Sequence, residues 1–470
     1  MVRARRVAST VTIAGSLALV ALTFPACGSD EESGEGGGSS SFGGEGGVTP
    51  PTVNVTPVKT CTSDAECPNG GKCKDVGASA KSCIYAKSCT GGAGADTKCG
   101  DNKDCCETRA VPGGSFNRFN DPDFPAKVSP FLLDTFEVTA GRFRAYVDAT
   151  KGNLRASAPA AGAGAHPKIP NSGWRTEWND LLPASAGDVD KMLGPDDAMG
   201  CEVGTNLDDY GALTWWTQAL DTKVKASNKD QSVLAENTRD ALDRKGLNCV
   251  PWYVLFAFCV WDGGRLPTDA EWGYAVSAGD EQRAFPWGAV PTADIVEIGG
   301  NNQLSFVPVW NAGKDFVVAS LWDKAVGPNV FPDNYVHTYG AKFRTKSDNA
   351  AHIAPVGKKP QGNGKWGHAD LAGGMFEWML DEGPIRPGQC NDCANVKWPA
   401  PNAKDPDAVK GPPDFEDRWF VGGARSVRGS AWDNALSLAT SQTKIEIEWY
   451  TSYPVKRTYR ALGGRCARNL

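Results

Sequence analysis

The segment NCVPWYVLFAFCVWDGGRLPTDAEWGYA, residues 248–275, decides the fold. Its first half predicts a helix, because large apolar residues and a cysteine recur at helical spacing: Trp252, Leu255, Phe256, Cys259 and Val260. The glycines and proline of GGRLPT end this helix. A second helix then begins at Thr268, with Asp269 and Glu271 in its first turn. Trp272 and Ala275 are expected on its buried face.

The composition indicates a large, loop-rich globular protein. The chain has 470 residues, which is long for one ordinary domain, and it contains 54 glycines and 31 prolines. This usage excludes a helical bundle and an integral membrane protein. The 15 cysteines favour an oxidising compartment.

Residues 1–26 have the pattern of an export signal. Three arginines precede an apolar stretch, residues 11–24, that is shorter than the roughly 20 residues of a spanning helix. The following LTFPACGSD, residues 22–30, resembles a bacterial lipobox. We therefore expect a lipoprotein signal peptide, lipidation of Cys27 and attachment to a bacterial membrane or cell surface. Ordinary signal-peptidase cleavage and an uncleaved anchor are the alternatives.

Residues 27–60 are expected to form a tether, because they consist largely of Gly, Ser, Glu and Pro without apolar periodicity. Without Arg3, Arg5 and Arg6 the chain keeps 46 basic against 55 acidic residues, a net charge of about −9. This charge excludes a nucleic-acid partner.

Residues 61–107 form a cysteine-rich module in this interpretation. The module contains eight cysteines: Cys61, Cys67, Cys73, Cys83, Cys89, Cys99, Cys105 and Cys106. So short a segment buries little core, so disulfides are expected to stabilise it. Zinc is the rival reading, although the segment has no histidine and no paired CxxC motifs. Eight cysteines allow 105 pairings, so the connectivity stays open.

Residues 108–470 resemble the sulfatase-modifying-factor family, which includes formylglycine-generating enzymes and iron-dependent sulfoxide synthases. The resemblance rests on five motifs in order: LDTFEVTAGRF (133–143), AFCVWDGGRLPTDAEWGYA (257–275), FPWG (285–288), GHADLAGGMFEW (367–378), and RGSAWDN (428–434) followed by GGRCAR (463–468). The resemblance implies an α+β fold, irregular and loop-rich, related to the C-type-lectin scaffold. Within it, FLLDTFEVT predicts a strand, and Thr139 is expected to cap a helix that buries Phe143, Tyr146 and Val147.

The family's oxidases use two cysteines that bind Cu(I) as thiolates. The corresponding positions here are Asp433 and Leu438, neither of which is a soft ligand. The family's iron enzymes carry histidine ligands in an added helical domain, and no His/carboxylate triad can be drawn from the four histidines His166, His337, His352 and His368. Neither copper nor iron is therefore expected, and His368 is expected at the surface or in a turn.

The resemblance also implies a structural disulfide between Cys259 and Cys466. The remaining cysteines of the main domain then leave Cys201 to pair with Cys249, and Cys390 with Cys393. The last pair, in CNDC, has a redox CxxC motif as its alternative reading.

A calcium site is a further expectation from the family. Its ligands correspond to Asp370, the carbonyls of Gly373 and Met375, and Glu377, in a turn whose glycines let the backbone fold around a hard cation. A second site would use Asp348 and Asn301 or Asn302. The alternative is that the carboxylates only cap turns.

The remaining motif residues have structural and binding interpretations. Arg265, Asp269 and Glu271 are expected to cap a helix and to connect loops, not to act as acid and base. The tryptophans are expected mainly in the core. A groove where the family binds substrate peptide would contain Trp366, Ser430, Trp432 and Asp433.

Three functions remain open from the sequence. The first is a non-catalytic module of an exported lipoprotein that binds a peptide or a glycan. The second is a formylglycine-generating oxidase acting on a cysteine of sulfatase-type substrates. The third is another oxidase activity on the same fold.

Overall fold

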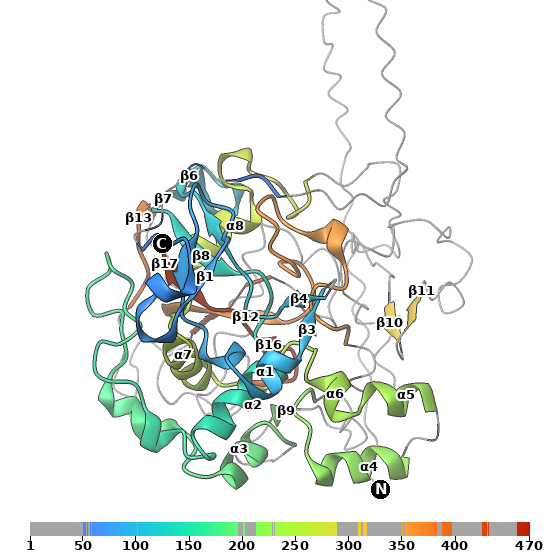
Figure 1. Ribbon diagram of the computed structural model, residues 1–470. Coiled ribbons are helices and arrows are strands. Elements are labelled where there is room, and N and C mark those ends of the chain that lie inside the picture. Colours follow the sequence, from blue (N-terminus) through green and yellow to red (C-terminus); the bar gives the residue numbers. More distant parts are fainter. Residues whose placement is uncertain are drawn as a thin grey trace, which may run out of the picture. The chain divides into compact units, whose positions relative to one another are not determined.

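Figure 1 shows the computed structural model of the chain. It describes most of residues 50–288, residues 350–382 and 388–396, and residues 425–431 and 458–470, with short gaps, and also 309–311 and 314–316. Two compact units are distinguished, Met1–Gly47 and Val48–Leu470, and every described residue belongs to the second. The predicted signal peptide, Cys27 and most of the tether lie outside the described residues. Among those that are described, no helix combines the length and apolarity needed to cross a membrane.

The cysteine-rich segment consists of very short elements fixed by four disulfides. The disulfides are Cys61–Cys73, Cys67–Cys83, Cys89–Cys106 and Cys99–Cys105. The elements are η1 (Asp64–Glu66), η2 (Pro68–Gly70), β1 (Lys72–Lys74), β2 (Ser82–Ile84), η3 (Lys87–Cys89), α1 (Gly92–Asp96), β3 (Lys98–Cys99) and β4 (Lys103–Asp104). Val76 and Ile84 of this segment are buried in the same apolar cluster as the first strands of the main domain. The segment is therefore part of one compact unit with that domain.

Strand β8 (Phe131–Asp134) is the centre of the first sheet of the main domain. It pairs antiparallel with β5 (Thr108–Val111) on one side and with β17 (Ala467–Asn469) on the other, so the C-terminal strand lies beside the first strands of the domain. Thr139 then caps α2 (Ala140–Ala149) by accepting a hydrogen bond from the backbone N–H of Arg142. Phe143, Tyr146 and Val147 are buried on this helix, as predicted.

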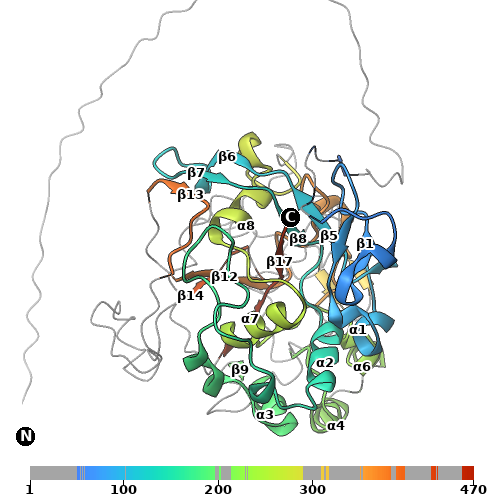
Figure 2. The same cartoon turned by 60° about the vertical axis from the view of Figure 1, so that its left-hand side comes forward.

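Helices α7 (Trp252–Trp261) and α8 (Asp269–Val276) contain the predicted apolar residues. All residues of α7 from Trp252 to Cys259 are buried, and so is every residue of α8. In Figures 1 and 2 the strand β12 (Phe376–Glu382) lies between the two helices. Trp178 packs edge-on against Trp174 and Trp252, with ring centroids 5.4 Å apart in each pair. Such large rigid side chains fill a core that has little regular secondary structure.

Two more three-stranded sheets contact α8, each through its central strand. In the first, β12 lies between β14 (Arg425–Arg428) and β16 (Leu462–Gly463). In the second, β7 (Pro125–Val128) lies between β6 (Gly114–Asn117) and β13 (Cys390–Asn391). This second sheet lies at the opposite end of the molecule from α3 (Ala186–Met192) and α4 (Gln218–Ser227) in both views (Figures 1 and 2).

The remaining elements are short. They are η4 (Arg118–Asn120), η5 (Arg155–Ser157), η6 (Thr176–Leu181), β9 (Cys201–Glu202), α5 (Gln231–Glu236), α6 (Arg239–Leu242), η8 (Gly279–Glu281), β10 (Val309–Asn311), β11 (Lys314–Phe316), η12 (Pro360–Gly362) and β15 (Thr458–Tyr459). FPWG forms a turn in which Phe285 and Gly288 exchange backbone hydrogen bonds. The mixture of short helices and small sheets is the α+β, loop-rich architecture predicted from the sequence.

Candidate functional site

The expected calcium turn leads into β12. Asp370 and the two glycines of this turn have left-handed backbone conformations, with φ of 54° at Asp370, 89° at Gly373 and 70° at Gly374. The Asp370 carboxylate accepts a hydrogen bond of 2.5 Å from the backbone N–H of Gly357. This bond ties the turn to a segment thirteen residues earlier, and the positive φ angles at Gly373 and Gly374 are ones that glycine adopts without strain.

Glu377, the fourth expected ligand, is paired with an arginine near the C-terminus. Arg465 donates from Nε and Nη2 to the two carboxylate oxygens of Glu377, each at 2.8 Å. The same guanidinium also donates to the backbone carbonyls of Asp134, Thr135 and Ala369. Glu377 is therefore not a free ligand, although each of its oxygens keeps a second lone pair.

Glu137 is a third carboxylate at this turn, and the sequence analysis missed it. Its Oε1 accepts a 2.8 Å hydrogen bond from the backbone N–H of Met375. A Cβ atom at Gly374 would lie only 2.5 Å from the same oxygen, so a glycine is required there. The acidic residue in FEVT was the available signal, but nothing local connects it with a turn more than 230 residues later.

Glu137, Asp370, Glu377 and Arg465 form a buried cluster of charged groups, and Lys359 lies close enough to act on Asp370. Burial, and then the charges of Asp370 and Glu377, raises the pKa of Glu137 well above its ordinary value. Burial also raises the pKa of Asp370, although the Gly357 N–H and Arg465 oppose the shift. The three carboxylates supply the oxygen ligands that a hard cation prefers, but among the described residues they do not form a group whose ligand oxygens all lie within 4.8 Å of one another. The second expected site, with Asp348 and Asn301 or Asn302, lies outside the described residues.

Most of the expected groove also falls outside the described residues, namely Ser430, Trp432 and Asp433, and so does Leu438, the second of the two copper-ligand positions. The structure describes Trp366 and shows that a groove position for it is wrong. Its side chain is 4% exposed and stacks on Tyr274, with centroids 5.4 Å apart. Packing of the two rings removes it from the surface. Arg428, just before Ser430, is buried with its guanidinium over the rings of Phe119 and Trp272.

The cysteines of the main domain are all in disulfides. The structure contains Cys259–Cys466, Cys201–Cys249 and Cys390–Cys393, the pairs that were expected. With the four pairs of the cysteine-rich segment, fourteen of the fifteen cysteines are bonded, and Cys27 lies outside the described residues. The described part of the chain therefore offers no pair of thiols as a soft metal site.

The charged residues of GRLPTDAEW have structural contacts. Glu271 completes a capping box with Thr268 and accepts two hydrogen bonds from Arg265, at 2.6 and 2.7 Å. Burial opposes ionisation of Glu271, but Arg265 and His166 keep its pKa far below the ordinary value. Asp269 begins α8, and its backbone N–H donates to Asp381 at 2.8 Å.

His368 contradicts its expected position at the surface. It is completely buried, and burial together with the nearby Arg465 lowers its pKa to about 3. Its flanking turn residues suggested exposure, but His368 lies against Arg109 of β5, Leu133 of β8 and Arg465. A neutral histidine of this kind belongs to the core.

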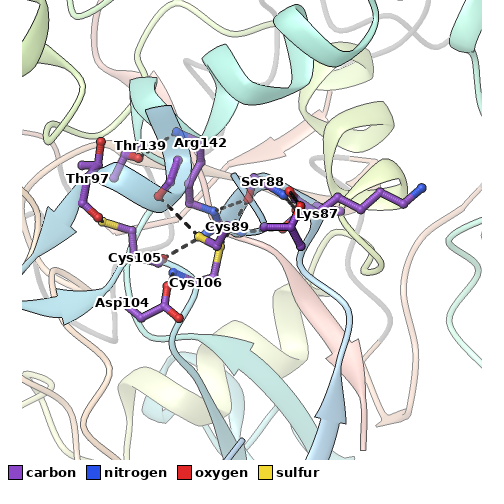
Figure 3. Close-up of a disulfide and its surroundings, with 12 residues drawn as sticks. Lys87, Ser88, Cys89, Thr97, Asp104, Cys105, Cys106, Thr139 and Arg142 are labelled. Carbon is purple, nitrogen blue, oxygen red and sulfur yellow. Dashed lines mark hydrogen bonds and ion pairs between the residues drawn. A yellow bond between two sulfur atoms is a disulfide. The ribbon is translucent and has the colours of Figure 1, made fainter. Parts of the chain in front are cut away.

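A buried charge network joins the cysteine-rich segment to the main domain, and Figure 3 shows its Ser88 and Arg142 beside Cys106. Arg142 donates to Asp134 at 2.9 Å, to Asp262 at 2.7 Å and to the hydroxyl of Ser88 at 3.1 Å. Arg468 binds the same two aspartates. The hydroxyl of Ser88 lies 3.3 Å from Sγ of Cys106, in the Cys89–Cys106 disulfide. Two arginines and two aspartates balance, so this network shows no charge excess that would call for an ion.

The sequence was compared with known proteins. A model of the sulfatase-modifying factor enzyme 1-like domain matches residues 96–470. A formylglycine-generating enzyme of Thermomonospora curvata is 26% identical over 231 residues, 47% of this chain and 64% of that protein. The inactive C-alpha-formylglycine-generating enzyme 2 of Mus musculus is 24% identical over 280 residues, 57% of this chain and 66% of that protein. The chain thus spans slightly less than two thirds of these relatives.

Among solved structures, PvdO from Pseudomonas aeruginosa is similar over 79% of this chain and 97% of its own. The TM-score is 0.36 and the sequence identity 18%.

Proposed function

Because the chain belongs to the sulfatase-modifying factor enzyme 1-like family, we propose that its domain is a non-catalytic module that binds a peptide or a glycan. The observation that carries the proposal is the state of the cysteines. All fourteen described cysteines are disulfide-bonded. Asp433 and Leu438 occupy the positions of the family's copper-binding cysteines.

Two thiolates are needed because Cu(I) is a soft ion that prefers sulfur ligands. Carboxylate and aliphatic side chains cannot replace them. The family contains both catalytic and non-catalytic members, since one relative is named a formylglycine-generating enzyme and another an inactive form. Membership of the family therefore does not decide whether this chain is catalytic. The residues at the copper-ligand positions decide it.

An anaerobic Cu(I) titration of the oxidised full-length protein tests the proposal. We expect no tight binding, and no aldehyde in a cysteine-containing sulfatase-type peptide incubated with protein, copper and oxygen. Tight binding with aldehyde formation would establish the oxidase alternative instead. The Cys390→Ser/Cys393→Ser variant is the matched control, because it removes the CxxC pair that reduction would convert into two thiols.

A calcium ion at the turn before β12 is the cofactor we propose. Asp370, Glu137 and the carbonyls of Gly373 and Met375 would hold it, and Glu377 would share its carboxylate between the ion and Arg465. Calcium would bind the ionised carboxylates and fix the turn against β12. This role is structural and involves no reaction step.

Export and lipid anchoring through Cys27 complete the proposal. The lipobox-like LTFPACGSD and the Gly/Ser-rich stretch after it support a folded module held away from a membrane surface by a tether. Metabolic labelling with a radioactive fatty acid tests this directly. We expect the label in the wild type and its loss in Cys27→Ser. A labelled Cys27→Ser variant would contradict the anchor.

A further inference from the structure

A hollow of about 420 Å³ lies on the sheet formed by β6, β7 and β13. This size falls within the range of small-ligand sites. The hollow is bounded by residues of all three strands, of η8 and of the loop before β13: Ser115, Phe116, Asn117, Pro125, Ala126, Lys127, Asp280, Gln282, Gln389, Cys390 and Asn391. The three strands lie together at one end of the molecule in both views (Figures 1 and 2).

The strand registers give this sheet a buried row and an exposed row. Phe116 pairs with Ala126, which pairs with Cys390, and all three are buried. The next row contains Ser115, Lys127 and Asn391, which are exposed. Because side chains alternate between the two faces of a strand, the buried row faces the core and the exposed row forms a polar surface toward solvent.

The loop that carries β13 is held rigidly although its tip is exposed. The Cys390–Cys393 disulfide closes it. Asp392 accepts hydrogen bonds from the backbone N–H and the hydroxyl of Ser129, at 2.6 and 2.8 Å, and forms an ion pair of 3.2 Å with Lys168. The backbone N–H of Asn395 donates to Asp381 at 3.1 Å. Binding loops that are ordered in advance lose little entropy when a ligand binds.

The outer edge of β6 is already occupied. The side-chain amide of Gln282 accepts from the backbone N–H of Asn117 at 2.8 Å and donates to its carbonyl at 3.1 Å. The Tyr274 hydroxyl donates to the carbonyl of Gly113. An extended peptide therefore cannot add a strand here through the backbone of Asn117, which is the usual way a sheet edge binds a peptide.

Six polar side chains around the hollow have no hydrogen bond or ion pair to another described residue: Ser115, Asn117, Lys127, Asp280, Gln389 and Asn391. Three are carboxamides, each with donors and an acceptor, and one is a hydroxyl. Lys127 and Asp280 are one cation and one anion, so the set has no net charge. An uncharged ligand with many hydroxyl groups matches this inventory better than a phosphate, a sulfate or an acidic chain.

From these contacts we infer that the hollow between β6, β7, β13 and η8 binds a neutral glycan, with Asn117 and Asn391 hydrogen-bonded to its hydroxyl groups. The inference rests on the proposed binding function and names its ligand class and its site. It also gives the CNDC disulfide a role, since the bond orders the wall of the site.

An array of neutral oligosaccharides, acidic oligosaccharides and peptides, probed with the full-length oxidised protein, tests the inference. We expect binding to neutral oligosaccharides. Asn117→Ala and Asn391→Ala should each weaken it about fivefold to tenfold, the equivalent of one lost hydrogen bond. Gln218→Ala removes an exposed carboxamide from α4, far along the chain from the hollow, and should leave affinity unchanged. Equal thermal midpoints of all variants establish that each one folds.

Three outcomes would overturn the inference. If neutral oligosaccharides bind and the two asparagine variants bind equally well, the site lies elsewhere and the proposed function stands. If only peptides or acidic oligosaccharides bind, the ligand class is wrong and the proposed function again stands. If nothing on the array binds, both the inference and the proposed binding function fail.

Discussion

Arg142 of helix α2 donates the hydrogen of its Nε to the hydroxyl of Ser88, 3.1 Å away and 54 residues earlier in the chain. Ser88 also donates its backbone N–H to Asp262 at 2.7 Å, and both residues are fully buried. The cysteine-rich segment thus satisfies polar groups inside the family domain (Figure 3). We conclude that the segment contributes to the stability of that domain.

The substitution Ser88→Ala tests this conclusion. It leaves the Nε–H of Arg142 buried without its acceptor, which typically costs about 1–3 kcal/mol. We expect a loss of that size in the free energy of unfolding, measured with denaturant under non-reducing conditions. Ser157→Ala, at an exposed serine of η5, is the control and should change stability little. Equal stability of both variants would show that the contact between Ser88 and Arg142 does not contribute to stability.

The disulfides should differ strongly in their effect on stability. Cys259–Cys466 closes a loop of 207 residues, whereas Cys390–Cys393 closes one of 3. Since a longer loop restricts the unfolded chain more, Cys259→Ala/Cys466→Ala should lower the free energy of unfolding by about 2–5 kcal/mol. Cys390→Ala/Cys393→Ala should cost less, while weakening glycan binding at the hollow. The reverse order of stability in thermal unfolding would contradict the loop argument.

The sequence predicted the features that local patterns and the family resemblance determine. Thr139 and Thr268 cap helices as expected, because a cap depends on residues within one turn. The Cys259–Cys466 pair followed from the family. Long-range packing was less accessible. His368 was expected at the surface or in a turn and Trp366 in a binding groove, yet the tertiary structure buries both.

The carboxylate cluster shows why sites are harder to predict than helices. Asp370 and Glu377 lie in one motif and were found from it. Glu137 lies 238 residues before Met375, from whose backbone N–H it accepts a hydrogen bond. Arg465 lies 88 residues after Glu377, with which it forms an ion pair. No periodicity or spacing connects such distant residues, so the clustering of these charged groups becomes visible only in the fold.

Calcium should stabilise the protein through this cluster. A ligand that binds only the folded state adds about 2.7 kcal/mol when its concentration is a hundred times its Kd. We therefore expect calcium chloride at millimolar concentration to raise the thermal midpoint by several degrees, and EDTA to reverse the effect. Asp370→Ala should abolish the response, and Asp280→Asn, at an exposed carboxylate outside the cluster, should keep it. No rise in the wild type, or an equal rise in Asp370→Ala, would remove the calcium site.

Asp381 should make the stability of the folded state depend on pH. Its carboxylate is buried and accepts backbone hydrogen bonds from Asp269 and Asn395. Burial, and then the charge of Asp269, raises the pKa of Asp381 to about 7, against about 3.9 for an unfolded chain. A raised carboxyl pKa means that the folded state holds the proton more tightly. The contribution of Asp381 to the free energy of unfolding is therefore complete below pH 4 and is lost as pH rises through about 7.

Wild-type protein should accordingly lose about 2–3 kcal/mol between pH 5 and pH 8 through this group. Asp381→Asn does not titrate, so its free energy of unfolding should fall less over the same interval, even if its stability at pH 5 is lower. Asp392→Asn is the control. Ser129 and Lys168 lower the pKa of Asp392 against the opposing effect of burial, so this residue stays ionised above pH 5 and its removal should preserve the wild-type slope. Denaturant titrations at several pH values measure all three slopes, and identical slopes for wild type and Asp381→Asn would show that Asp381 does not titrate in this range.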